Sequence, residues 1–570
     1  MYKYFTKYWK SYLLGALFLI GVNLLAAYIP QLIKKAINLL QNQSITPETL
    51  SSSINEILLT LLGSALIMAF LRTKSRHVIF GIGRQIEFDL KKDIFNHLVH
   101  LEPAFFENKK AGDLISIITN DVQSFRALGG FAILNIMNST IAFSVIVPLM
   151  WQVNSTLTIS FLSLVPILIG FVTYLSKAIK THQQKVTEML GSISHFIEQN
   201  LSGIHIIKSY GQEEAEIKRF KEQNHDLLEE YLHLIKARSF ISPIMKVVAS
   251  LGFILLLYIG GGAVLKSNFS LGDFAAYSLY IERLIWPIAT LGWLITIVYR
   301  VQVSSRRITE VLNIKAQIAD ADGAEEVSEF KDSIQLHSLG AQILKGQKIG
   351  IVGPIGSGKS ILAQKLMRLK DCEKNEIFID GIDIKNIKID SLRKIINMVP
   401  QETFLFSTSI AENIAYGVDI SDEEVEKYSK AACFHEEIHK FPDGYQTVVG
   451  ERGITLSGGQ RQRVAIARAL AINPDILILD DSLSSIDDHI ASQILTNIHE
   501  LRKGKTTIFI THKLQIIQNA ENIFVMDKFN IVEQGRHQEL LRSPHEDSVY
   551  KQLWYKASNL IKKEGELSND

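Results

Sequence analysis

Residues 349–360 read "IGIVGPIGSGKS", and this stretch decides the fold of the C-terminal half of the chain. A short apolar run comes before the pattern G-x-x-x-x-G-K-S, and the helix-like segment "ILAQKLMRL" comes after it. Small residues let backbone N–H groups turn inward around a phosphate, and the dipole of the following helix favours the anion. The predicted phosphate-binding residues are Gly353, Pro354, Ile355, Gly356, Ser357, Gly358, Lys359 and Ser360. Among them, Lys359 can reach the terminal phosphates of a nucleotide, and the Ser360 hydroxyl can bind Mg²⁺.

A second segment, "DILILDD" at 475–481, supplies carboxylates to the same predicted domain. Its apolar residues predict a buried strand that ends at Asp480 and is followed at once by Asp481. A carboxylate at the end of such a strand can hold the Mg²⁺ of a bound nucleotide, as in other P-loop enzymes. Apolar strands that end in aspartate are common, so this segment alone would not indicate a metal ligand. The phosphate loop in the same predicted domain is what favours that role for Asp480.

A third segment, "LSGGQRQRVAIARAL" at 456–470, predicts a helix that starts at Ser457, Gly458 and Gly459. Open backbone amides and a serine hydroxyl at a helix start make a second anion site. The alternative is an ordinary capped helix. Two phosphate-binding elements so far apart in sequence suggest that the nucleotide is shared, with one copy of the domain binding it from each side.

The two halves of the chain differ in composition. From 334 to about 555, short β-branched runs alternate with helical patterns, which predicts an α/β domain with a largely parallel sheet. The first 300 residues hold most of the apolar residues of a chain that is 47% hydrophobic. Six stretches there are long and apolar enough to span a bilayer: 12–33, 54–72, 128–150, 153–176, 241–265 and 271–300. The predicted domains are a six-helix transmembrane domain at 1–307, a linker at 308–333, the α/β P-loop domain at 334–555 and a disordered tail at 556–570.

The last predicted span contains Glu282 and Arg283 near its middle. Charges inside a membrane are costly and usually face protein or water. These two residues therefore pair or face an interior cavity, unless the helix bends or is shorter than the range given.

The connections between the spans predict the orientation of the chain. The long connections 73–127 and 177–240 are rich in Lys and Arg, whereas 41–53 and 151–152 contain neither. By the positive-inside rule, the long connections and both termini are cytoplasmic, although Lys34 and Lys35 weakly oppose this orientation.

The long connections also have a structure of their own in the sequence. Helical spacing of their apolar residues predicts that the spans continue well past the lipid as cytoplasmic extensions. Two pieces with helix breakers, "FFENKKAGD" and "SYGQEEAE", are either contact elements at the cytoplasmic tips or plain turns.

The formal net charge of +1 gives no case for a nucleic-acid partner. The chain has two cysteines, Cys372 and Cys433, which are no disulfide framework and fit a reducing compartment better.

Together these motifs resemble an ABC transporter half-molecule of the exporter type, over about residues 10–555. Gly353–Ser360 matches the Walker A motif of that family, Ile476–Asp480 matches Walker B, and Leu456–Gln460 matches the signature LSGGQ. Further matches are Gln401 in "MVPQETFLFSTSIAENIAYG" for the Q-loop, Asp487 in "SSID" for the D-loop and His512 in "FITHK" for the switch histidine. "GERG" at 450–453 matches a stretch that touches the cytoplasmic tips of the membrane domain.

The resemblance implies roles for these residues. Asp481, His512 and Gln401 would act in catalysis, and Ser360, Gln401 and Asp480 would hold Mg²⁺. Ser457, Gly458, Gly459 and Gln460 would contact the ATP whose phosphates lie in a partner's P-loop.

The resemblance also implies a transport cycle. Two such domains would close head to tail around two ATP molecules and turn the membrane cavity outward, and hydrolysis would reopen the pair. The implied protein is a multi-pass subunit of the plasma (inner) membrane that works with a second half-transporter. It lies among membrane lipids, with a cytoplasmic ATPase domain, and moves an amphipathic drug, lipid or peptide.

The sequence departs from the family pattern at Asp481, where the family usually has glutamate to orient or deprotonate the attacking water. Aspartate is one methylene shorter, and a misplacement of about 1 Å can cost about 100-fold in rate. This site should therefore bind ATP and hydrolyse it slowly, unless backbone shifts restore the reach. Because the signature is intact, the asymmetry resembles the degenerate-site subunit of a heterodimeric exporter, and a heterodimer is favoured over a homodimer.

A second departure lies before the P-loop. The family places an aromatic residue about 25 residues upstream to stack on adenine, but "SIQLHSLGAQILKGQKIG" contains no Tyr, Phe or Trp. The segment is short, as if part of a β-hairpin were missing, and Phe330 upstream of it is in the wrong register. The sequence predicts weaker or less adenine-selective binding. Ile361 also stands where a second hydroxyl often follows Ser360.

Three other functions remain open. The chain can be a nucleotide-regulated channel or regulatory subunit, which Asp481 and the missing aromatic residue favour slightly. It can also be a slow homodimeric lipid flippase. A soluble-type ATPase tethered to the membrane is disfavoured by the six predicted spans.

Overall fold

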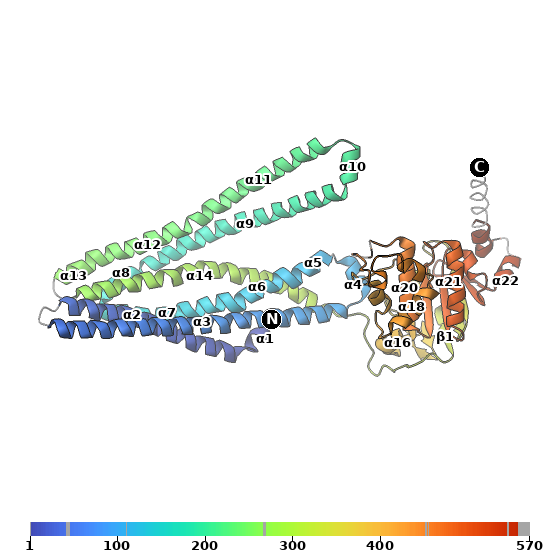
Figure 1. Cartoon of the computed structure of the whole chain (residues 1–570), viewed down its shortest axis with the longest axis horizontal. Helices are drawn as coiled ribbons and strands as arrows, with labels where there is room; N and C mark the ends of the chain where they lie inside the picture. Colours follow the sequence, from blue (N-terminus) through green and yellow to red (C-terminus); the bar gives the residue numbers. More distant parts are fainter. Residues whose placement is uncertain are drawn as a thin grey trace. The chain divides into compact units, whose positions relative to one another are not determined.

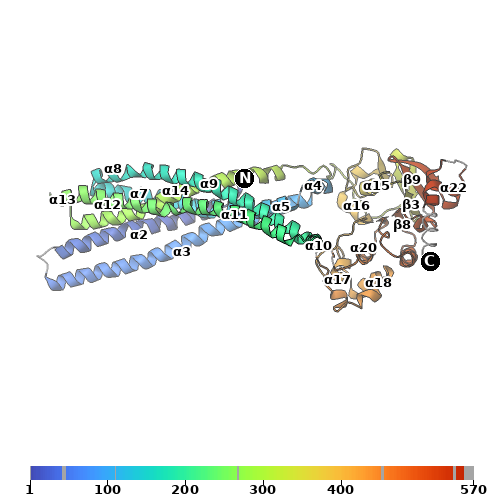
Figure 2. The same cartoon turned by 90° about the horizontal axis from the view of Figure 1, so that it is seen from above.

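The computed structural model describes residues 2–41, 46–109, 111–265, 269–450, 453, 455–543 and 547–556. Two compact units divide the chain (Figures 1 and 2). One comprises Met1–Val99 and Lys110–Ile314, and the other comprises His100–Lys109 and Lys315–Asp570.

The described part of the first unit is helical throughout, and three stretches of π-helix, η1 to η3, interrupt its α-helices. Its helices are α1 Tyr2–Thr6, α2 Trp9–Gln41, α3 Pro47–Val99, α5 Ala111–Ser116, η1 Ile117–Asp121, α6 Val122–Ala127, η2 Leu128–Ala132, α7 Ile133–Val153, α8 Ser155–Leu162, α9 Leu164–Ser202, α10 Ile204–Ser209, α11 Glu213–Ser239, α12 Ile241–Leu255, η3 Leu256–Gly260, α13 Gly261–Leu265 and α14 Leu271–Leu312.

Five helical stretches among the described residues are long and apolar enough to cross a membrane, and they coincide with the first five predicted spans. They are Trp9–Gln41, Pro47–Val99, Ala111–Val153, Ser155–Ser202 and Glu213–Val264. The sixth predicted span, 271–300, lies within α14, which is not among these five. On α14 the Glu282 side chain is exposed and Arg283 is half-buried.

The helices are much longer than a bilayer requires. With 53 residues, α3 is about 80 Å long at about 1.5 Å per residue, whereas the hydrocarbon core is about 30 Å thick. This excess agrees with the predicted extensions. Within one such extension, α3 packs closely against the stretch formed by α6 and η2. A Cβ added to Gly83 of α3 would lie 2.8 Å from the carbonyl oxygen of Arg126 in α6. Beside this contact Glu87 forms ion pairs with Lys91 at 2.9 Å and with Arg126 at 3.3 Å.

The pair of α9 and α11 forms an arm that leaves the other helices of this unit (Figure 1). Its two helices are held together by a small core of Val186, Ile193, Leu227 and Leu234. The opposite faces of the arm carry exposed apolar side chains, which are Leu190, Ile197, Leu201, Ile206, Leu228 and Leu232. The connection between these helices contains the short helix α10, and "SYGQEEAE" at 209–216 runs from the last residue of α10 into the start of α11.

The second unit contains two sheets. Its strands are β1 Ser333–Leu336, β2 Ala341–Leu344, β3 Lys348–Val352, β4 Ile377–Ile379, β5 Ile382–Asp383, β6 Ile396–Val399, β7 Ile476–Asp480, β8 Thr506–Ile510, β9 Asn522–Asp527 and β10 Asn530–Gly535. Its α-helices are α4 Pro103–Asn108, α15 Lys359–Leu366, α16 Ile389–Ile395, α17 Ile410–Ile414, α18 Asp422–Ala431, α19 His435–Ile438, α20 Gly458–Ile472, α21 Asp488–Leu501 and α22 His537–Arg542. The six-stranded sheet has the order β10-β9-β3-β8-β7-β6, and the four-stranded sheet has the order β2-β1-β4-β5.

The larger sheet is parallel except at its β10 edge, as the sequence predicts for an α/β domain. Strand β3 pairs in parallel with β8 and β9, and β7 pairs in parallel with β6 and β8. All five residues of β7 are buried. Since carboxyl ends of parallel strands meet at one edge of a sheet, the segments after β3, β6, β7 and β8 come together there.

The smaller sheet contains the shortened hairpin. Strands β1 and β2 pair from Ser333 with Leu344 to Leu336 with Ala341. They are joined by the single turn of 3₁₀ helix η4, His337–Leu339, and by Gly340 at φ 62°. Residues 337–340 are therefore the whole connection between the two strands.

The predicted linker at 308–333 is more ordered than its polar composition indicates. Its first residues continue α14 to Leu312. Farther along, the Arg368 guanidinium donates to the carbonyl oxygen of Ala319 at 3.0 Å, and Glu325 forms a bridge with Ile387. Composition does not reveal these partners because they lie 49 or more residues away.

Two other predicted segments lie at the limits of the described residues. Residues 557–570 of the predicted tail are outside the described residues. Residues 451 and 452 of "GERG" are also outside them, and so is residue 454, which follows "GERG". The piece "FFENKKAGD" contains α4, and His100–Lys109 groups with the α/β unit rather than with the helices on either side of it in sequence.

Candidate nucleotide-binding site

The sheet edge brings four predicted site segments together. The P-loop leaves β3 at Val352, and Asp480 is the last residue of β7. Gln401 follows β6 by two residues, and His512 follows β8 by two. The register pairs Asp480 with Ile510 and Val399 with Leu479, so these strand ends are level.

The P-loop forms a cradle that its own lysine spans. Gly356 and Gly358 have φ of 82° and 99°, a left-handed backbone that glycine adopts readily. The buried Lys359 ammonium donates to the carbonyl oxygens of Gly353 at 2.9 Å and Pro354 at 2.8 Å, and to Ser357 Oγ at 3.3 Å. Burial lowers the pKa of Lys359, and the charges of the neighbouring aspartates oppose this shift. An entering phosphate would replace these carbonyl contacts with a full negative charge.

Asp480 carries the buried carboxylate of the site. It is 6% exposed, and its side chain is hydrogen-bonded to Ser360. Burial raises the pKa of Asp480, and the Ser360 bond opposes the shift. A buried carboxylate that is costly to charge is stabilised by a cation, so this pair fits a divalent ion.

The donor set also fits Mg²⁺ in its chemistry. Mg²⁺ takes oxygen ligands and usually keeps several waters beside one or two carboxylates and substrate phosphates. Ser360, Asp480 and Gln401 offer a hydroxyl, a carboxylate and an amide oxygen. In the described residues no group of three or more His, Cys, Asp and Glu side chains forms a metal site by itself.

Asp481 has an unusual backbone and an incomplete set of partners. Its φ is 47°, a left-handed value that aspartate tolerates better than most residues, and its N–H donates to the carbonyl oxygen of Ile510 at 2.7 Å. One carboxylate oxygen, Oδ2, lies 3.5 Å from Gln401 Nε2. The other, Oδ1, is buried without a hydrogen-bond partner among the described residues, as is Ser482 Oγ beside it. Gln401 and His512 are exposed.

The segment Ser457–Gln460 forms the start of α20. Ser457 Oγ accepts from Gln460 N–H at 3.3 Å, and Gln460 Oε1 accepts from Ser457 N–H at 2.9 Å, which makes a capping box. Gln460 also donates to Glu437 at 2.9 Å, and Arg463 pairs with that carboxylate at 2.7 Å. These bonds fix the start of the helix while Ser457 stays exposed, and none of them involves the P-loop.

Sequence reasoning missed the residue that joins this helix to the segment after β7. Gln462 is buried, accepts from Ser485 N–H at 3.1 Å and donates to Ser484 Oγ at 3.4 Å. A Cβ on Gly459 would lie 2.8 Å from the carbonyl oxygen of Ser485. A few residues on, Asp487 caps α21 by accepting from His489 N–H at 2.9 Å. A polar residue on the buried face of a predicted amphipathic helix is the signal that could have identified Gln462.

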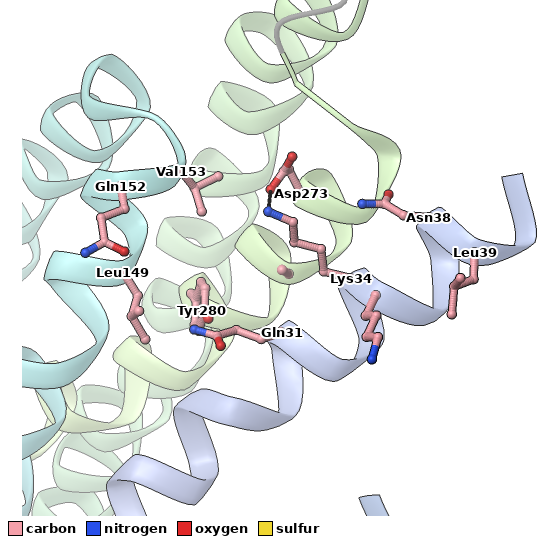
Figure 3. Close-up of a pocket in the computed structure, with 11 residues that line it drawn as sticks. Gln31, Lys34, Asn38, Leu39, Leu149, Gln152, Val153, Asp273 and Tyr280 are labelled. Carbon is pink, nitrogen blue, oxygen red and sulfur yellow. Dashed lines mark ion pairs between the residues drawn. The ribbon is translucent and has the colours of Figure 1, made fainter. Parts of the chain in front are cut away.

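A second candidate site lies within the helical unit. A cavity of about 800 Å³ is bounded by the ends of α2 and α7 and the start of α14 (Figure 3). Lys34 of α2 points across it to Asp273 of α14, with Nζ 2.5 Å from Oδ1. Gln31 and Gln152 also line it, so the cavity is polar although the helices around it are apolar.

A P-loop beside a buried carboxylate, on a chain with helices long enough to cross a membrane, defines the class as a membrane-embedded nucleotide-binding ATPase. The description "ABC transporter transmembrane region" matches residues 12–288, and "ABC transporter" matches residues 336–484.

Curated relatives and a solved structure cover nearly the whole chain. A "Probable multidrug resistance ABC transporter ATP-binding/permease protein YheI" of Bacillus subtilis is 32% identical over 94% of each chain. An "ATP-dependent lipid A-core flippase" of Saccharophagus degradans is 31% identical over 83% of this chain and 82% of its own. A structure of a bacterial Atm1-family ABC exporter with ATP bound shares the fold with a TM-score of 0.80 and 24% identity, covering 96% of this chain and 99% of its own.

The chain therefore belongs to the ABC transporter family, as a half-molecule of the exporter type with one membrane domain and one ATP-binding domain. It is embedded in a membrane, binds nucleotide and couples ATP hydrolysis to transport.

Proposed function

We propose that this chain is the weak-site half of a heterodimeric exporter for an amphipathic substrate. The observation that carries the proposal is Asp481, which stands at the end of β7 where the water-activating carboxylate is required. Its Oδ1 is buried without a hydrogen-bond partner in the described part of the chain, and its Oδ2 is 3.5 Å from Gln401 Nε2. A side chain one methylene shorter than glutamate holds water too far from the terminal phosphate, and a displacement of about 1 Å lowers the rate by about 100-fold.

In this proposal each residue of the site makes a particular contact with ATP. The phosphates enter the P-loop between Gly353 and Ser360, and Lys359 exchanges its carbonyl partners for phosphate oxygens. Ser360, Asp480 and Gln401 would hold Mg²⁺, and the ion would supply positive charge beside the phosphates. Asp481 and His512 face the reacting end of the nucleotide from β7 and β8.

The second half-transporter is supported by surfaces that one chain leaves uncovered. The Ile355 side chain at the tip of the P-loop is 92% exposed, and Ser457 at the start of α20 is exposed as well. Leu201 at the end of α9 and Ile206 on α10, both beyond the predicted membrane span, are 67% and 65% exposed. Exposed apolar side chains of this kind are candidates for contact with a partner. A partner with its own P-loop would meet Ser457–Gln460 and receive their amides on its ATP.

The closed dimer explains how ATP drives transport. ATP that contacts a P-loop of one subunit and a signature helix of the other binds the closed pair better than the open pair, and this differential affinity shifts the population to the closed state. Hydrolysis removes the bridging phosphate and the pair reopens. The fast reaction would occur over this chain's signature and the partner's glutamate.

The polar cavity between α2, α7 and α14 supports an amphipathic substrate. A polar head group can lie against Gln31, Lys34 and Gln152 while an apolar tail contacts the surrounding helices (Figure 3). The names of the relatives, a multidrug transporter and a lipid A-core flippase, agree with drug-like or lipid substrates. The basic long connections support an orientation with the ATPase domain and both termini in the cytoplasm, and the proposed location of the chain is the plasma (inner) membrane.

The experiment is to purify the full-length chain alone, and together with a half-transporter that has glutamate after its Walker B aspartate. We expect slow ATP turnover alone, and fast, substrate-stimulated turnover in a stable one-to-one complex. Robust turnover by the chain alone would contradict the heterodimer and favour a homodimeric flippase. Nucleotide-gated ion current without uphill transport would favour the channel.

The cavity is tested in the same complex with Lys34→Ala. This change should weaken stimulation of the ATPase by amphiphiles and leave unstimulated turnover intact. The control is Lys74→Ala, because Lys74 is exposed on α3 and does not line the cavity. Equal stimulation in both variants would exclude the cavity as a substrate site.

A further inference from the structure

The turn between β9 and β10 has a composition that its backbone disfavours. Asp527 pairs with Asn530, so Lys528 and Phe529 are the two central residues of the hairpin turn. Both have positive φ, 45° and 66°. Turns of this geometry favour Asn and Gly, and a bulky residue at positive φ is strained. Such an outlier leads to a hypothesis of function when its neighbours are taken into account.

The neighbours of Phe529 are the P-loop and the first turns of α15. Phe529 N–H donates to the carbonyl oxygen of Ser357 at 3.1 Å, which holds the turn against the loop. Its ring lies directly on Gly358, where a Cβ would be 2.6 Å from ring atom Cδ1. Despite these contacts the Phe529 side chain is 58% exposed, so one face of an aromatic ring stays open beside the phosphate cradle.

That open ring borders a cavity of about 360 Å³. Gly358, Ile361, Leu362 and Lys365 of the P-loop and α15 line one side of it, at the spacing of a single helix face. The rest is lined by residues 337–339 of the β1–β2 hairpin, residues 373–376 and the β9–β10 turn, which include His337, Asn375 and Phe529. The cavity has the size of a small-molecule site, about 300–1,000 Å³, and it combines an aromatic face with polar groups at its rim.

We propose that Phe529 is the stacking residue for the base of the nucleotide whose phosphates lie in this P-loop. The β1–β2 hairpin contains no Tyr, Phe or Trp, and Phe529 supplies an aromatic ring at the border of the same cavity. The ligand class is the nucleobase of a nucleoside triphosphate, held by stacking and by polar groups such as His337 and Asn375. The inference rests on the nucleotide site proposed above and adds a specificity residue to it.

The test compares nucleotide with a ligand that has no base. Binding of ATP, GTP and inorganic tripolyphosphate is measured by calorimetry on the full-length chain in lipid nanodiscs. Phe529→Gly should weaken ATP binding by about 5- to 100-fold, the range expected for loss of one base–aromatic stack, and leave tripolyphosphate binding unchanged. Phe529→Trp should keep ATP binding. Val532→Ala on the same hairpin is the control, because Val532 is exposed and does not line the cavity.

Thermal unfolding separates binding from structure. Because glycine relieves the strain at φ 66°, Phe529→Gly should raise the melting temperature of the nucleotide-free protein while it weakens ATP binding. A lower melting temperature together with equal losses of ATP and tripolyphosphate binding would show that the ring only supports the P-loop, and would overturn the proposal.

Two further outcomes are distinguishable. Equal ATP affinity in wild type and Phe529→Gly would overturn the stacking role and leave the nucleotide site intact. Failure of the wild-type chain to bind either ATP or tripolyphosphate would overturn the nucleotide site itself, and the stacking role with it.

Discussion

The P-loop edge of the sheet and the start of α20 differ in how completely their polar groups are partnered. At the sheet edge, Asp481 Oδ1 and Ser482 Oγ are buried without hydrogen-bond partners among the described residues. At the start of α20, Ser457 and Gln460 bond each other, and Glu437 receives bonds from Gln460 and Arg463. In the proposed heterodimer, this difference would leave the surface offered to a partner's nucleotide complete and the chain's own reaction site weakened.

The largest effect is expected from a substitution at the start of α20, where the polar groups are fully partnered. Gly459→Ala would place a Cβ 2.8 Å from the carbonyl oxygen of Ser485, a backbone atom that cannot move away cheaply. Displacing the donors of an anion site costs about 10²–10³-fold in kcat, so we expect a loss of that order in ATP turnover of the two-subunit complex. Gly63→Ala in α3 is the control, since nothing lies within 4 Å of its Cβ. Unchanged turnover in Gly459→Ala would show that this chain's signature does not serve the fast site.

An intermediate effect is expected at the buried amide that joins α20 to the segment after β7. Gln462→Ala removes its bonds to Ser484 and Ser485 and leaves a backbone N–H without its acceptor. An unsatisfied buried group costs about 1–3 kcal/mol, which denaturant or thermal unfolding of the ATPase domain can measure. Gln462→Glu, which keeps an acceptor for Ser485 N–H, should lose less. Equal stability of Gln462→Ala and wild type would contradict the link between these two segments.

The smallest effect is expected for Ser457→Ala, which tests whether Ser457 does more than cap α20. Ser457 caps α20 in the same way as Ser421 caps α18, each with a capping box. Loss of an N-cap costs about 1 kcal/mol, so Ser457→Ala and Ser421→Ala should lower stability alike. Only Ser457→Ala should also lower turnover of the two-subunit complex. If both variants kept full turnover, Ser457 would be a helix cap and nothing more.

The sequence predicts the parts of the site that depend on strand ends. A strand before the P-loop and a strand before Asp480 suffice for those two segments, because parallel strands deliver their carboxyl ends to one edge. Gln401 and His512 follow only from the resemblance to the ABC exporter family. The membrane helices and their extensions are predicted for the same kind of reason, since length and apolar spacing are local properties.

The rest depends on tertiary contacts that no local pattern records. Lys528 and Phe529 are not turn formers, so their hairpin turn and the ring over Gly358 could not be foreseen. The positive φ of Asp481 follows from a bond to Ile510, 29 positions away. The polar linker is ordered by partners such as Arg368 and Ile387, which belong to the α/β domain.

In the proposed heterodimer, the short side chain of Asp481 limits the chain's own site by reach. The most direct measurement is steady-state ATP turnover of the full-length chain purified without a partner, in wild type, Asp481→Glu and Asp481→Asn. We expect slow turnover in wild type, a rise of about 10- to 100-fold in Asp481→Glu as the lost methylene is restored, and no gain in Asp481→Asn. Fast turnover in wild type that Asp481→Glu leaves unchanged would show that reach at this position does not limit the site.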